Sequence, residues 1–312
     1  MLRFISFRLL VTIPVLFGAV LFGFTLMRIV PGDPAALLAG QDATQEMVDL
    51  IHRNLGLDQP LPLQFFQYVI QLAQGDLGRS IISNRDVSAE LIDAMVPTLE
   101  LVLVAILIAV PLGILFGVFA ALRRGTLIDR GLMAISVAGI SLPVFWTAYV
   151  LILIFGVRWG LLPFAGRAGP PWTVDGFLAL ILPAVTAAFV LLGPLARITR
   201  AAVLENLESE HVRLARAKGL SEAQVILKHV LRNAMLPIVT LIGLQIGHLL
   251  GGTVIIETIF AWPGVGRLVV GAIMNSDYAT AQGGLIAIAI TFIAVNLLID
   301  LTYSLLDPRI AS

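Results

Sequence analysis

The sequence contains six long apolar runs in which charged side chains are rare. Each run has about 19 residues or more, the length that an α-helix needs to cross roughly 30 Å of hydrocarbon at about 1.5 Å per residue. A transmembrane β-barrel is excluded, because its strands alternate apolar and polar residues whereas these runs are apolar on every side. We predict an all-α fold, a polytopic transmembrane helix bundle with six spans at about residues 9–29, 98–121, 132–157, 177–197, 235–256 and 281–305.

The composition agrees with a chain whose solvent is largely lipid. Hydrophobic residues make up 58% of the sequence and charged residues 13%, against about half and about a quarter in soluble domains. The net charge is zero, which gives no basis for binding nucleic acid. Disulfides, thiolate metal sites and cysteine nucleophiles are excluded because the sequence has no cysteine. Four dispersed histidines predict no metal cluster; they are His52, His211, His229 and His248.

Basic residues are distributed unevenly among the loops. If the six spans alternate in direction, one set of loops holds 13 of the 20 Lys and Arg residues. These are Arg3, Arg8, Arg123, Arg124, Arg130, Arg197, Arg200, Arg213, Arg216, Lys218, Lys228, Arg232 and Arg309. The positive-inside rule places this set in the cytoplasm, together with both termini. The first apolar run is predicted to stay as a span, because it is too long for a secretory signal and no A-x-A-like site follows.

These patterns divide the chain into four parts. They are the cytoplasmic tip and first span (1–30), an external cap (31–96), a membrane core (97–306) with a cytoplasmic loop (198–234), and a cytoplasmic tail (307–312). The cap has nine acidic residues against three arginines, and turn-forming stretches such as 75-GDLGRS-80 cut it into short pieces. We predict short helices near residues 46–54 and 62–72, in a cap too small for an independent core.

The cytoplasmic loop carries five basic residues within 212-VRLARAKGLSEAQVILKHVLRNAMLP-237. Three acidic residues precede the first basic ones, an order of charges that complements a helix macrodipole; they are Glu205, Glu208 and Glu210. Gly219 is typical of a helix C-terminus, and Ser221 opens a capping-box pattern with Gln224. We predict a helix, a glycine corner at 218–220 and a second helix that runs to Pro237.

Three interpretations of this ordered loop were open. A solvated connector is the simplest, because charge runs usually mark wet surfaces. A helix-turn-helix DNA reader is disfavoured, because both ends of the loop are fixed to the bilayer and acidic residues dilute the basic ones. A docking element for a cytoplasmic protein explains best why a polar loop is ordered at all.

The stretch 213-RLARAKGLSEAQVILKHVLRNAMLPIVT-240 resembles the loop with which ABC importer permeases dock on their ATPase, in the version of the dipeptide and oligopeptide branch, which includes nickel and glutathione systems. The resemblance extends over nearly the whole chain, through 31-PGDPA-35, 55-LGLDQPL-61, 75-GDLGRS-80, 97-PTLEL-101, 257-ETIFAWPGVGRL-268 and 306-LDPRI-310. One departure concerns the Glu-Ala-Ala that begins the general loop: Arg213 and Leu214 replace its first two residues, and only Ala215 matches.

The resemblance implies a type I importer-like fold in the cell inner membrane. It implies a permease subunit, not an enzyme, that works with a homologous second permease, two ABC ATPase subunits and an external substrate-binding protein. The sequence has no G-x-x-x-x-G-K-[ST] phosphate loop, so we expect no cofactor on this chain and ATP with Mg on the partner ATPases. The expected cargo is a dipeptide, oligopeptide, glutathione or nickel complex. The expected ATPase-docking residues are Arg213, Ala215, Ala217, Lys218, Gly219, Leu220 and Ser221.

Polar residues within the spans are candidates for the transport pathway. His248 is the strongly titratable side chain deep inside a span, and such groups tend to face a cavity or a hydrogen-bond partner on another helix. Gln245, Gln282 and Asn296 are similar candidates. The outer stretch 257-ETIFAWPGVGR-267 has two interpretations, an aromatic interface anchor or a re-entrant corner at the pathway mouth. The pathway or gate candidates are Gln245, His248, Glu257, Phe260, Trp262 and Gly264.

Two other function classes were weighed. An ion-gradient-driven secondary transporter or channel is the main alternative, but several buried carboxylates or a clear inverted repeat are expected there, and neither is evident. An intramembrane enzyme needs convergent catalytic side chains within the spans, and the sequence suggests none.

Overall fold

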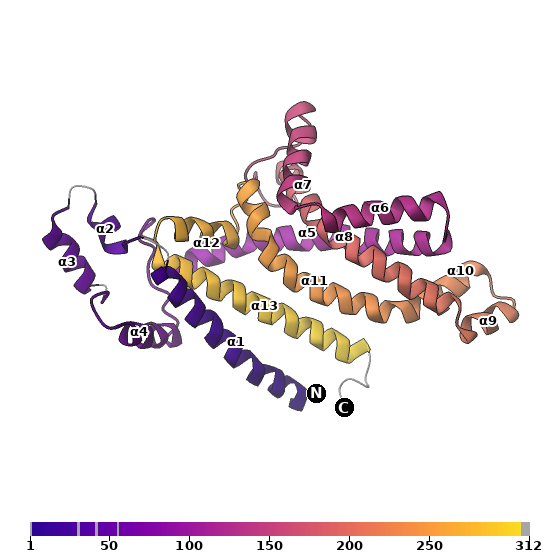
Figure 1. Cartoon of the computed structure of the whole chain (residues 1–312), viewed down its shortest axis with the longest axis horizontal. Coiled ribbons are helices and arrows are strands. Elements are labelled where there is room, and N and C mark those ends of the chain that lie inside the picture. Colours follow the sequence, from indigo (N-terminus) through magenta and orange to yellow (C-terminus); the bar gives the residue numbers. More distant parts are fainter. Residues whose placement is uncertain (1, 30–31, 41–42, 55, 307–312) are drawn as a thin grey trace. The chain divides into compact units, whose positions relative to one another are not determined.

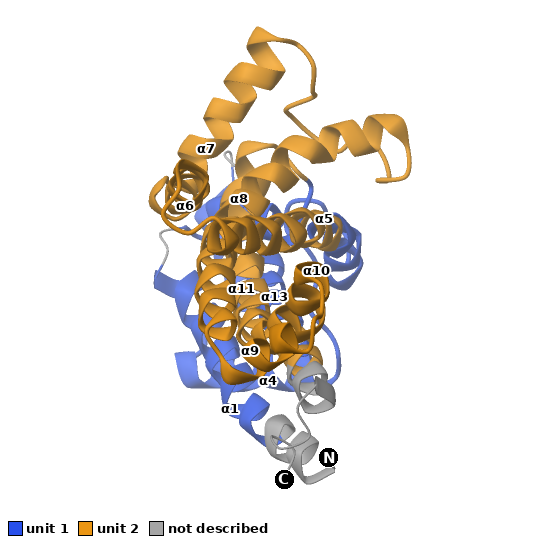
Figure 2. Cartoon of the chain, turned by 90° about the vertical axis from the view of Figure 1, so that its right-hand side faces the viewer, with its two compact units in different colours: residues 1–98, 263–294 blue, residues 99–262, 295–312 orange. Residues whose placement is uncertain are grey.

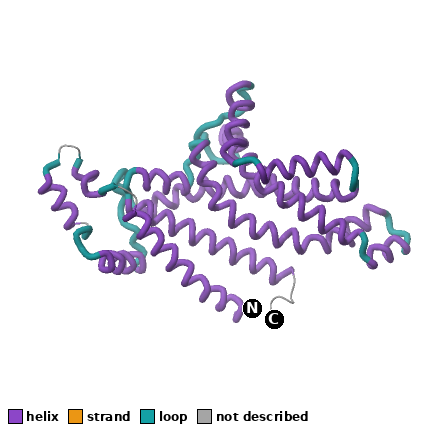
Figure 3. The backbone as a smooth tube through the Cα atoms, viewed as in Figure 1, coloured by secondary structure: helices purple, strands orange, loops and turns teal. Residues whose placement is uncertain are grey.

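The computed structural model describes residues 2–29, 32–40, 43–54 and 56–306. In this part of the chain the backbone forms helices joined by loops and contains no strand (Figures 1 and 3), which confirms the all-α class. The predicted tail at 307–312 lies outside the described residues, as does most of 306-LDPRI-310. Two compact units are present (Figure 2): Met1–Thr98 with Pro263–Ala294 forms unit 1, and Leu99–Trp262 with Val295–Ser312 forms unit 2.

Within the described residues, five helices are long and apolar enough to cross a membrane, or six if one bent pair is counted as a span. The five are Leu10–Ile29, Val87–Leu122, Val174–Leu207, Glu222–Ile259 and Tyr278–Ile299. The bent pair is Leu127–Ser141 with Val144–Arg158, at an angle of 111°. The predicted polytopic bundle is confirmed, with the difference that its third span is sharply broken.

The break in the third span lies at Leu142–Pro143, between α6 (Leu127–Ser141) and α7 (Val144–Leu151). Proline has no N–H for a helical hydrogen bond, and its ring disfavours the helical conformation in the residue before it. Leu142 accordingly has extended backbone angles, with φ −82° and ψ 131°. The chain bends here because two residues in succession leave the helical region.

Unit 1 contains residues 31–96, which the sequence predicted to form a cap, together with parts of several long helices. Its elements are α1 (Leu2–Ile29), α2 (Pro34–Ala39), α3 (Gln45–Asn54), α4 (Leu61–Ala73), the start of α5 (Val87–Leu122), α12 (Val265–Met274) and the start of α13 (Tyr278–Leu306). Helices α3 and α4 confirm the two short helices predicted in the cap. The ring of Phe65 on α4 meets Phe24 on α1 edge-on at 5.1 Å, and a small core joins α5 to α12 through Val87, Leu91 and Val265.

A buried carboxylate holds the motif 75-GDLGRS-80 against the start of α13. The Ser80 hydroxyl donates to Asp277 Oδ2 at 2.6 Å, and the Thr280 hydroxyl donates to the same oxygen at 2.9 Å. Asp277 is 1% exposed, so these donors are needed to offset the desolvation of its carboxylate. The motif is thus fixed in place by hydrogen bonds as well as by apolar packing.

Unit 2 is built around α8 (Val174–Leu207), which packs against α6, α7 and α11. Its other elements are the rest of α5, the π-helical turn η1 (Ile152–Arg158), α9 (Glu210–Ala217), α10 (Glu222–Gln224), the π-helical turn η2 (Val225–Val230) and α11 (Leu231–Ile259). The core between these helices includes Leu180, Leu182, Leu191 and Leu195, all nearly inaccessible to solvent. Helix α8 is therefore the central support of this unit.

Small residues let α5 approach α8 closely. A Cβ at Gly113 would lie 2.7 Å from the Leu195 Cβ, and one at Gly117 would collide with Thr199 and the Ala196 carbonyl. The two glycines are four residues apart and share one face of α5, as in the close helix pairs of membrane proteins. Backbone proximity replaces the bulky side-chain packing that soluble cores use.

This close approach can be tested by replacing one glycine. We expect Gly117→Ala to destabilise the protein by about 1–3 kcal/mol, because the added methyl overpacks the α5–α8 contact. Gly131→Ala on α6 is the matched control: no atom lies within 4 Å of its new Cβ. There the substitution should be neutral or stabilise by up to about 1 kcal/mol. Thermal unfolding in detergent measures the stability of both variants. Equal changes in stability would contradict the close α5–α8 packing at Gly117.

Candidate functional site

The predicted helix–corner–helix is present in the loop at 198–234, and we call residues 209–224 the elbow. Helix α9 spans Glu210–Ala217, and α10 begins at Glu222 (Figure 1). Gly219 has φ +80°, in the left-handed region, and its N–H donates to the Arg216 carbonyl at 2.9 Å. The glycine corner is therefore confirmed, with the backbone conformation that the sequence predicted.

The elbow is continuous with two long helices. Only Glu208 and Ser209 separate α8 from α9. On the other side α10, η2 and α11 follow one another without a break from Glu222 to Ile259. The second helix was predicted to run to Pro237, where the fifth span begins, and the structure shows that helix and span are continuous, with Pro237 inside α11. Glu205 lies in the last turn of α8 and Glu208 is the residue that caps its C-terminus, which leaves Glu210 as the acidic residue in the first turn of α9.

An apolar layer beneath the elbow holds its shape. Val212 and Ala215 on α9 are buried, and they belong to one cluster with Val225, Val230 and Ala234. Ala215 is only 4% exposed. It therefore packs inside the elbow, whereas the other predicted docking residues are exposed: Arg213, Ala217, Lys218, Gly219, Leu220 and Ser221.

Ion pairing adds a weaker constraint across the corner. Arg216 Nε donates to Glu222 Oε1 at 2.8 Å, and Nη2 donates to Oε2 at 3.2 Å. This hydrogen-bonded carboxylate raises the pKa of Arg216. Both side chains are well exposed, so water and salt screen the pair and it contributes little to stability.

The predicted capping box is only partly formed. Ser221 has the extended backbone of an N-cap residue, with φ −64° and ψ 149°, but its side chain makes no capping hydrogen bond. The Glu222 carboxylate is directed to Arg216 across the corner. The pattern therefore located the start of the helix and misassigned the side chains that act there.

A histidine ties the elbow to the long helix that follows. Asn233 Nδ2 lies 2.9 Å from His211 Nε2, so the amide donates to that ring nitrogen. His211 is on α9 and Asn233 is on α11. The hydrogen bond thus joins the first turn of α9 directly to α11.

The aromatic residues of the outer stretch are buried. Phe260 and Trp262 are each 1% exposed and lie in the core around α8. The Phe260 carbonyl accepts from Gly166 N–H at 2.8 Å, and the Trp262 N–H donates to the Glu257 carbonyl at 2.8 Å. The interface-anchor interpretation is therefore wrong, because neither ring reaches the surface.

Two ion pairs that the sequence did not reveal fix the loops of unit 2. Arg167 Nε and Nη2 each lie 2.8 Å from a carboxylate oxygen of Glu100, beside the Gly166–Phe260 contact. Arg200 makes a similar two-pronged contact with Asp129 at 2.7 and 2.8 Å. The sequence shows opposite charges in loops and at helix ends, but it does not show which of them meet.

The remaining pathway candidates are not gathered in one place. His248 is exposed on α11 and Gln245 is half-buried, and neither makes a side-chain hydrogen bond within the described residues. Glu257 is fully buried. Gly264 is the residue before α12 in unit 1, where Gln282 is also buried. Among the described residues no group of three or more His, Cys, Asp or Glu could hold a metal ion.

The corner conformation predicts how substitutions at Gly219 behave. No atom lies within 4 Å of an added Cβ, so the cost of a side chain comes from the backbone alone. Gly219→Val should lose about 1–2 kcal/mol of local stability, whereas Gly219→Asn should lose less, because asparagine tolerates the left-handed region. Hydrogen exchange of peptides covering 210–224 should be faster in the valine variant only. Equal hydrogen-exchange rates in the valine and asparagine variants would contradict the requirement for a left-handed backbone at Gly219.

Comparisons with known proteins agree across the whole chain. Residues 113–312 match the family model described as binding-protein-dependent transport system inner membrane component, and residues 1–114 match the model of its N-terminal part. The di/tripeptide transport system permease protein DppB of Pseudomonas aeruginosa (strain UCBPP-PA14) is 43% identical over 333 residues, covering 99% of each chain. The glutathione transport system permease protein GsiC of Escherichia coli (strain K12) is 41% identical over 310 residues, also covering 99% of each.

Two solved structures share the fold. An inward-facing MetNI methionine ABC transporter matches with a TM-score of 0.58 and 19% identity, covering 70% of this chain and 96% of that chain. An amino acid ABC transporter with histidines matches with a TM-score of 0.50 and 18% identity, covering 71% and 94%.

Proposed function

The chain belongs to the family of binding-protein-dependent transport system inner membrane components, and from this premise we propose that it moves short peptides or a similar small solute across the inner membrane. It is a multi-pass permease subunit and not an enzyme. The observation that carries the proposal is the 41–43% identity, over 99% of the chain, to permeases named for di/tripeptides and glutathione. The ion-driven alternative has no comparable support.

The partners follow from the division of labour in such an importer. We propose a homologous second permease, two ATPases that carry ATP and Mg, and an external substrate-binding protein. The family description itself names dependence on a binding protein. The absence of a phosphate-loop motif from the sequence supports ATP binding on separate subunits.

The elbow is proposed as the ATPase-docking site. It offers an exposed surface that combines Leu214, which is 61% exposed, with the charges of Arg213 and Lys218. Apolar side chains at the centre with charged ones around them suit a protein–protein contact. Ala215 acts beneath this surface by packing, so its proposed role is to hold the elbow and not to touch the ATPase.

The continuity of the flanking helices supports a lever mechanism. A force on the elbow acts on α8 through a two-residue link and on α11 with no interruption. Packed helices respond to such forces by moving as rigid bodies, because their cores deform little. ATPase closure would therefore tilt α8 and α11 and change access to the pathway between the two permeases.

The exposed polar side chains on α11 are proposed to face that pathway. His248 and Gln245 lie on a part of α11 that the chain's own core leaves uncovered. Phe260 and Trp262 are proposed to support the outer gate from within the core, with Glu257 and Gly264 at the two ends of this segment. The acidic cap, 31–96, is proposed as part of the surface that receives the binding protein.

The coupling role predicts an uncoupled variant. In proteoliposomes holding the complete importer, Gly219→Val should lower ATP-driven uptake of a labelled dipeptide at least about tenfold while ATP hydrolysis persists, because a distorted corner transmits closure poorly. The matched control is Gly125→Val at the α5–α6 turn. Gly125 has φ +81° and equally open surroundings, so it bears the same backbone strain away from the elbow. Unchanged uptake in Gly219→Val, or equal losses in both variants, would refute the docking role.

Cross-linking tests the contact directly. The sequence has no cysteine, so Lys218→Cys gives a single thiol at the exposed tip of the elbow. A thiol-to-amine cross-linker should join this position to an ATPase subunit in the purified complex. Val174→Cys, exposed at the opposite end of α8, should give no such product. No cross-link from position 218 to an ATPase subunit, or cross-links from both positions, would contradict the proposed docking site.

A further inference from the structure

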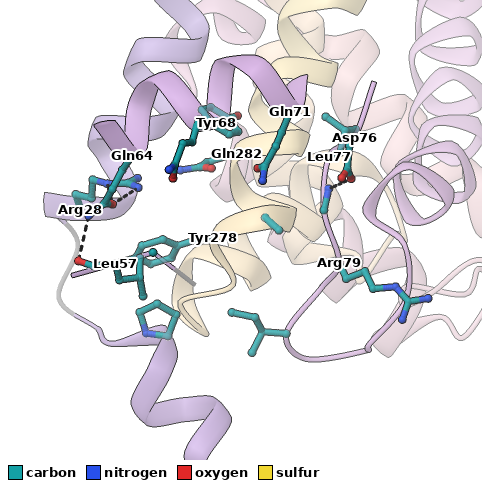
Figure 4. A pocket seen from close by; sticks show the side chains of 16 residues that line it. Arg28, Leu57, Gln64, Tyr68, Gln71, Asp76, Leu77, Arg79, Tyr278 and Gln282 are labelled. Carbon is teal, nitrogen blue, oxygen red and sulfur yellow. Dashed lines mark hydrogen bonds between the residues drawn. The ribbon is translucent and has the colours of Figure 1, made fainter. Parts of the chain in front are cut away.

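Unit 1 contains a polar cavity that the transport mechanism above does not use. The cavity has a volume of about 270 Å³ and lies between the end of α1, helix α4, the loop 76–81 and the start of α13. Figure 4 shows Arg28, Gln64, Gln71 and Gln282 along its wall, together with the rings of Tyr68 and Tyr278. Its volume is slightly below the roughly 300 Å³ at the lower end of ordinary ligand pockets, so it suits a small ligand.

The cavity wall includes three charged side chains, of which Arg28 is half-buried and Arg79 and Asp76 are exposed. Arg28 Nε and Nη2 donate to Gln64 Oε1 at 3.3 and 2.8 Å, and Nη1 donates to the Phe24 carbonyl at 3.0 Å. A guanidinium has five N–H groups, so these contacts leave one N–H on each terminal nitrogen. Arg28 makes no ion pair with a carboxylate of the described residues, and the oxygens that it does contact are neutral.

The ring of Phe24 fixes the orientation of this guanidinium. Arg28 Cζ lies 3.3 Å from the centroid of the Phe24 ring, which stacks against the cation. Stacking and the Gln64 contact together hold the planar group in one position. An oriented guanidinium with free N–H groups is the usual partner of a carboxylate, which accepts charge-assisted hydrogen bonds.

Carboxamides form much of the remaining polar wall. Gln64, Gln67 and Gln71 share one face of α4, and Gln282 projects from α13. Gln282 is 94% buried (6% exposed) and lines the cavity, yet its carboxamide has no hydrogen-bond partner among the described residues. The Tyr68 hydroxyl in the same wall is buried without a partner among the described residues. Buried polar groups normally find partners, so this hydroxyl points to a group that arrives with the ligand. A carboxamide both donates and accepts, which complements a peptide bond.

We propose that this cavity binds the C-terminal end of a short peptide, with Arg28 on the terminal carboxylate and Gln282 and Gln71 on the adjacent peptide bond. The assignment of the ligand class rests on the proposed peptide transport, whereas the carboxylate preference rests on Arg28. Its lining residues come from the cap and from the ends of two candidate spans, all within unit 1, so we assign it as a holding site for cargo in unit 1.

The test uses the complete importer in lipid nanodiscs, without the external binding protein. Three probes are titrated and followed by saturation-transfer NMR: alanyl-alanine, its C-terminal amide and acetate. We expect saturable binding of alanyl-alanine and about 10- to 100-fold weaker binding of the amide, because the amide cannot form the charge-assisted pair. Acetate should also bind at least about tenfold more weakly than the dipeptide, because it lacks the peptide bond.

Two variants and a matched control assign the contacts. In Arg28→Gln the acid and the amide should bind alike, whereas Gln282→Leu should weaken both by the same factor. Arg85→Gln is the control, because Arg85 is in the same unit but pairs with Asp93 and does not line the cavity. It should retain the wild-type ratio of affinities.

The outcomes separate the cavity from the transport function. Equal binding of acid and amide to the wild-type complex, which requires no substitution, would overturn the carboxylate site. An unchanged ratio of acid to amide affinity in Arg28→Gln would also overturn the carboxylate site. Acetate binding as tight as that of alanyl-alanine would overturn the assignment of a peptide as the ligand. ATP-driven uptake is measured on the same purified importer after reconstitution in proteoliposomes together with the external binding protein. Uptake without saturable binding at Arg28 refutes the cavity proposal alone, and binding without uptake refutes the transport proposal alone.

Discussion

The hydrocarbon core of a bilayer offers no water to an unpaired backbone group, and this constraint determines most of the structure. Every apolar run of the chain must satisfy its N–H and C=O groups internally, so each becomes a helix. Lipid gives little hydrophobic reason for helices to associate, and the α5–α8 contact is accordingly built on Gly113 and Gly117, where the backbones approach closely. Helix α8 becomes the central element because several neighbours pack against it.

Polar chemistry is consequently concentrated at the helix ends and in the loops. The Asp129–Arg200 and Glu100–Arg167 pairs are each largely shielded from solvent. Such pairs gain attraction in a low dielectric but lose the hydration of both charges, so their net contribution to stability is small. Their effect on geometry is larger. A guanidinium that donates to both oxygens of one carboxylate allows only one relative position of the two segments that carry these side chains. They fix how α6 and the loop containing Arg167 sit on the bundle.

The sequence predicted features that depend on local backbone chemistry. The spans follow from length and hydropathy, and the elbow follows from Gly219, whose left-handed conformation few other residues adopt readily. Features that depend on contacts distant in sequence were not predictable. Proline illustrates the limit: Pro143 breaks the third span, while Pro183 and Pro194 lie inside an unbroken α8. The inward position of Ala215 and the carboxamide wall around Arg28 also required the fold.

The departure of the elbow from the general importer loop now has a physical interpretation. Arg213 stands where that loop has a glutamate, which removes one acidic side chain from the proposed docking surface. The shape of the elbow does not depend on that contact, because its rigidity comes from the buried layer that includes Val212, Ala215 and Val225. The Arg216–Glu222 pair is exposed and adds little to this. If the elbow acts as the lever proposed above, a surface residue can change with the partner ATPase, whereas the apolar layer and the glycine corner must stay.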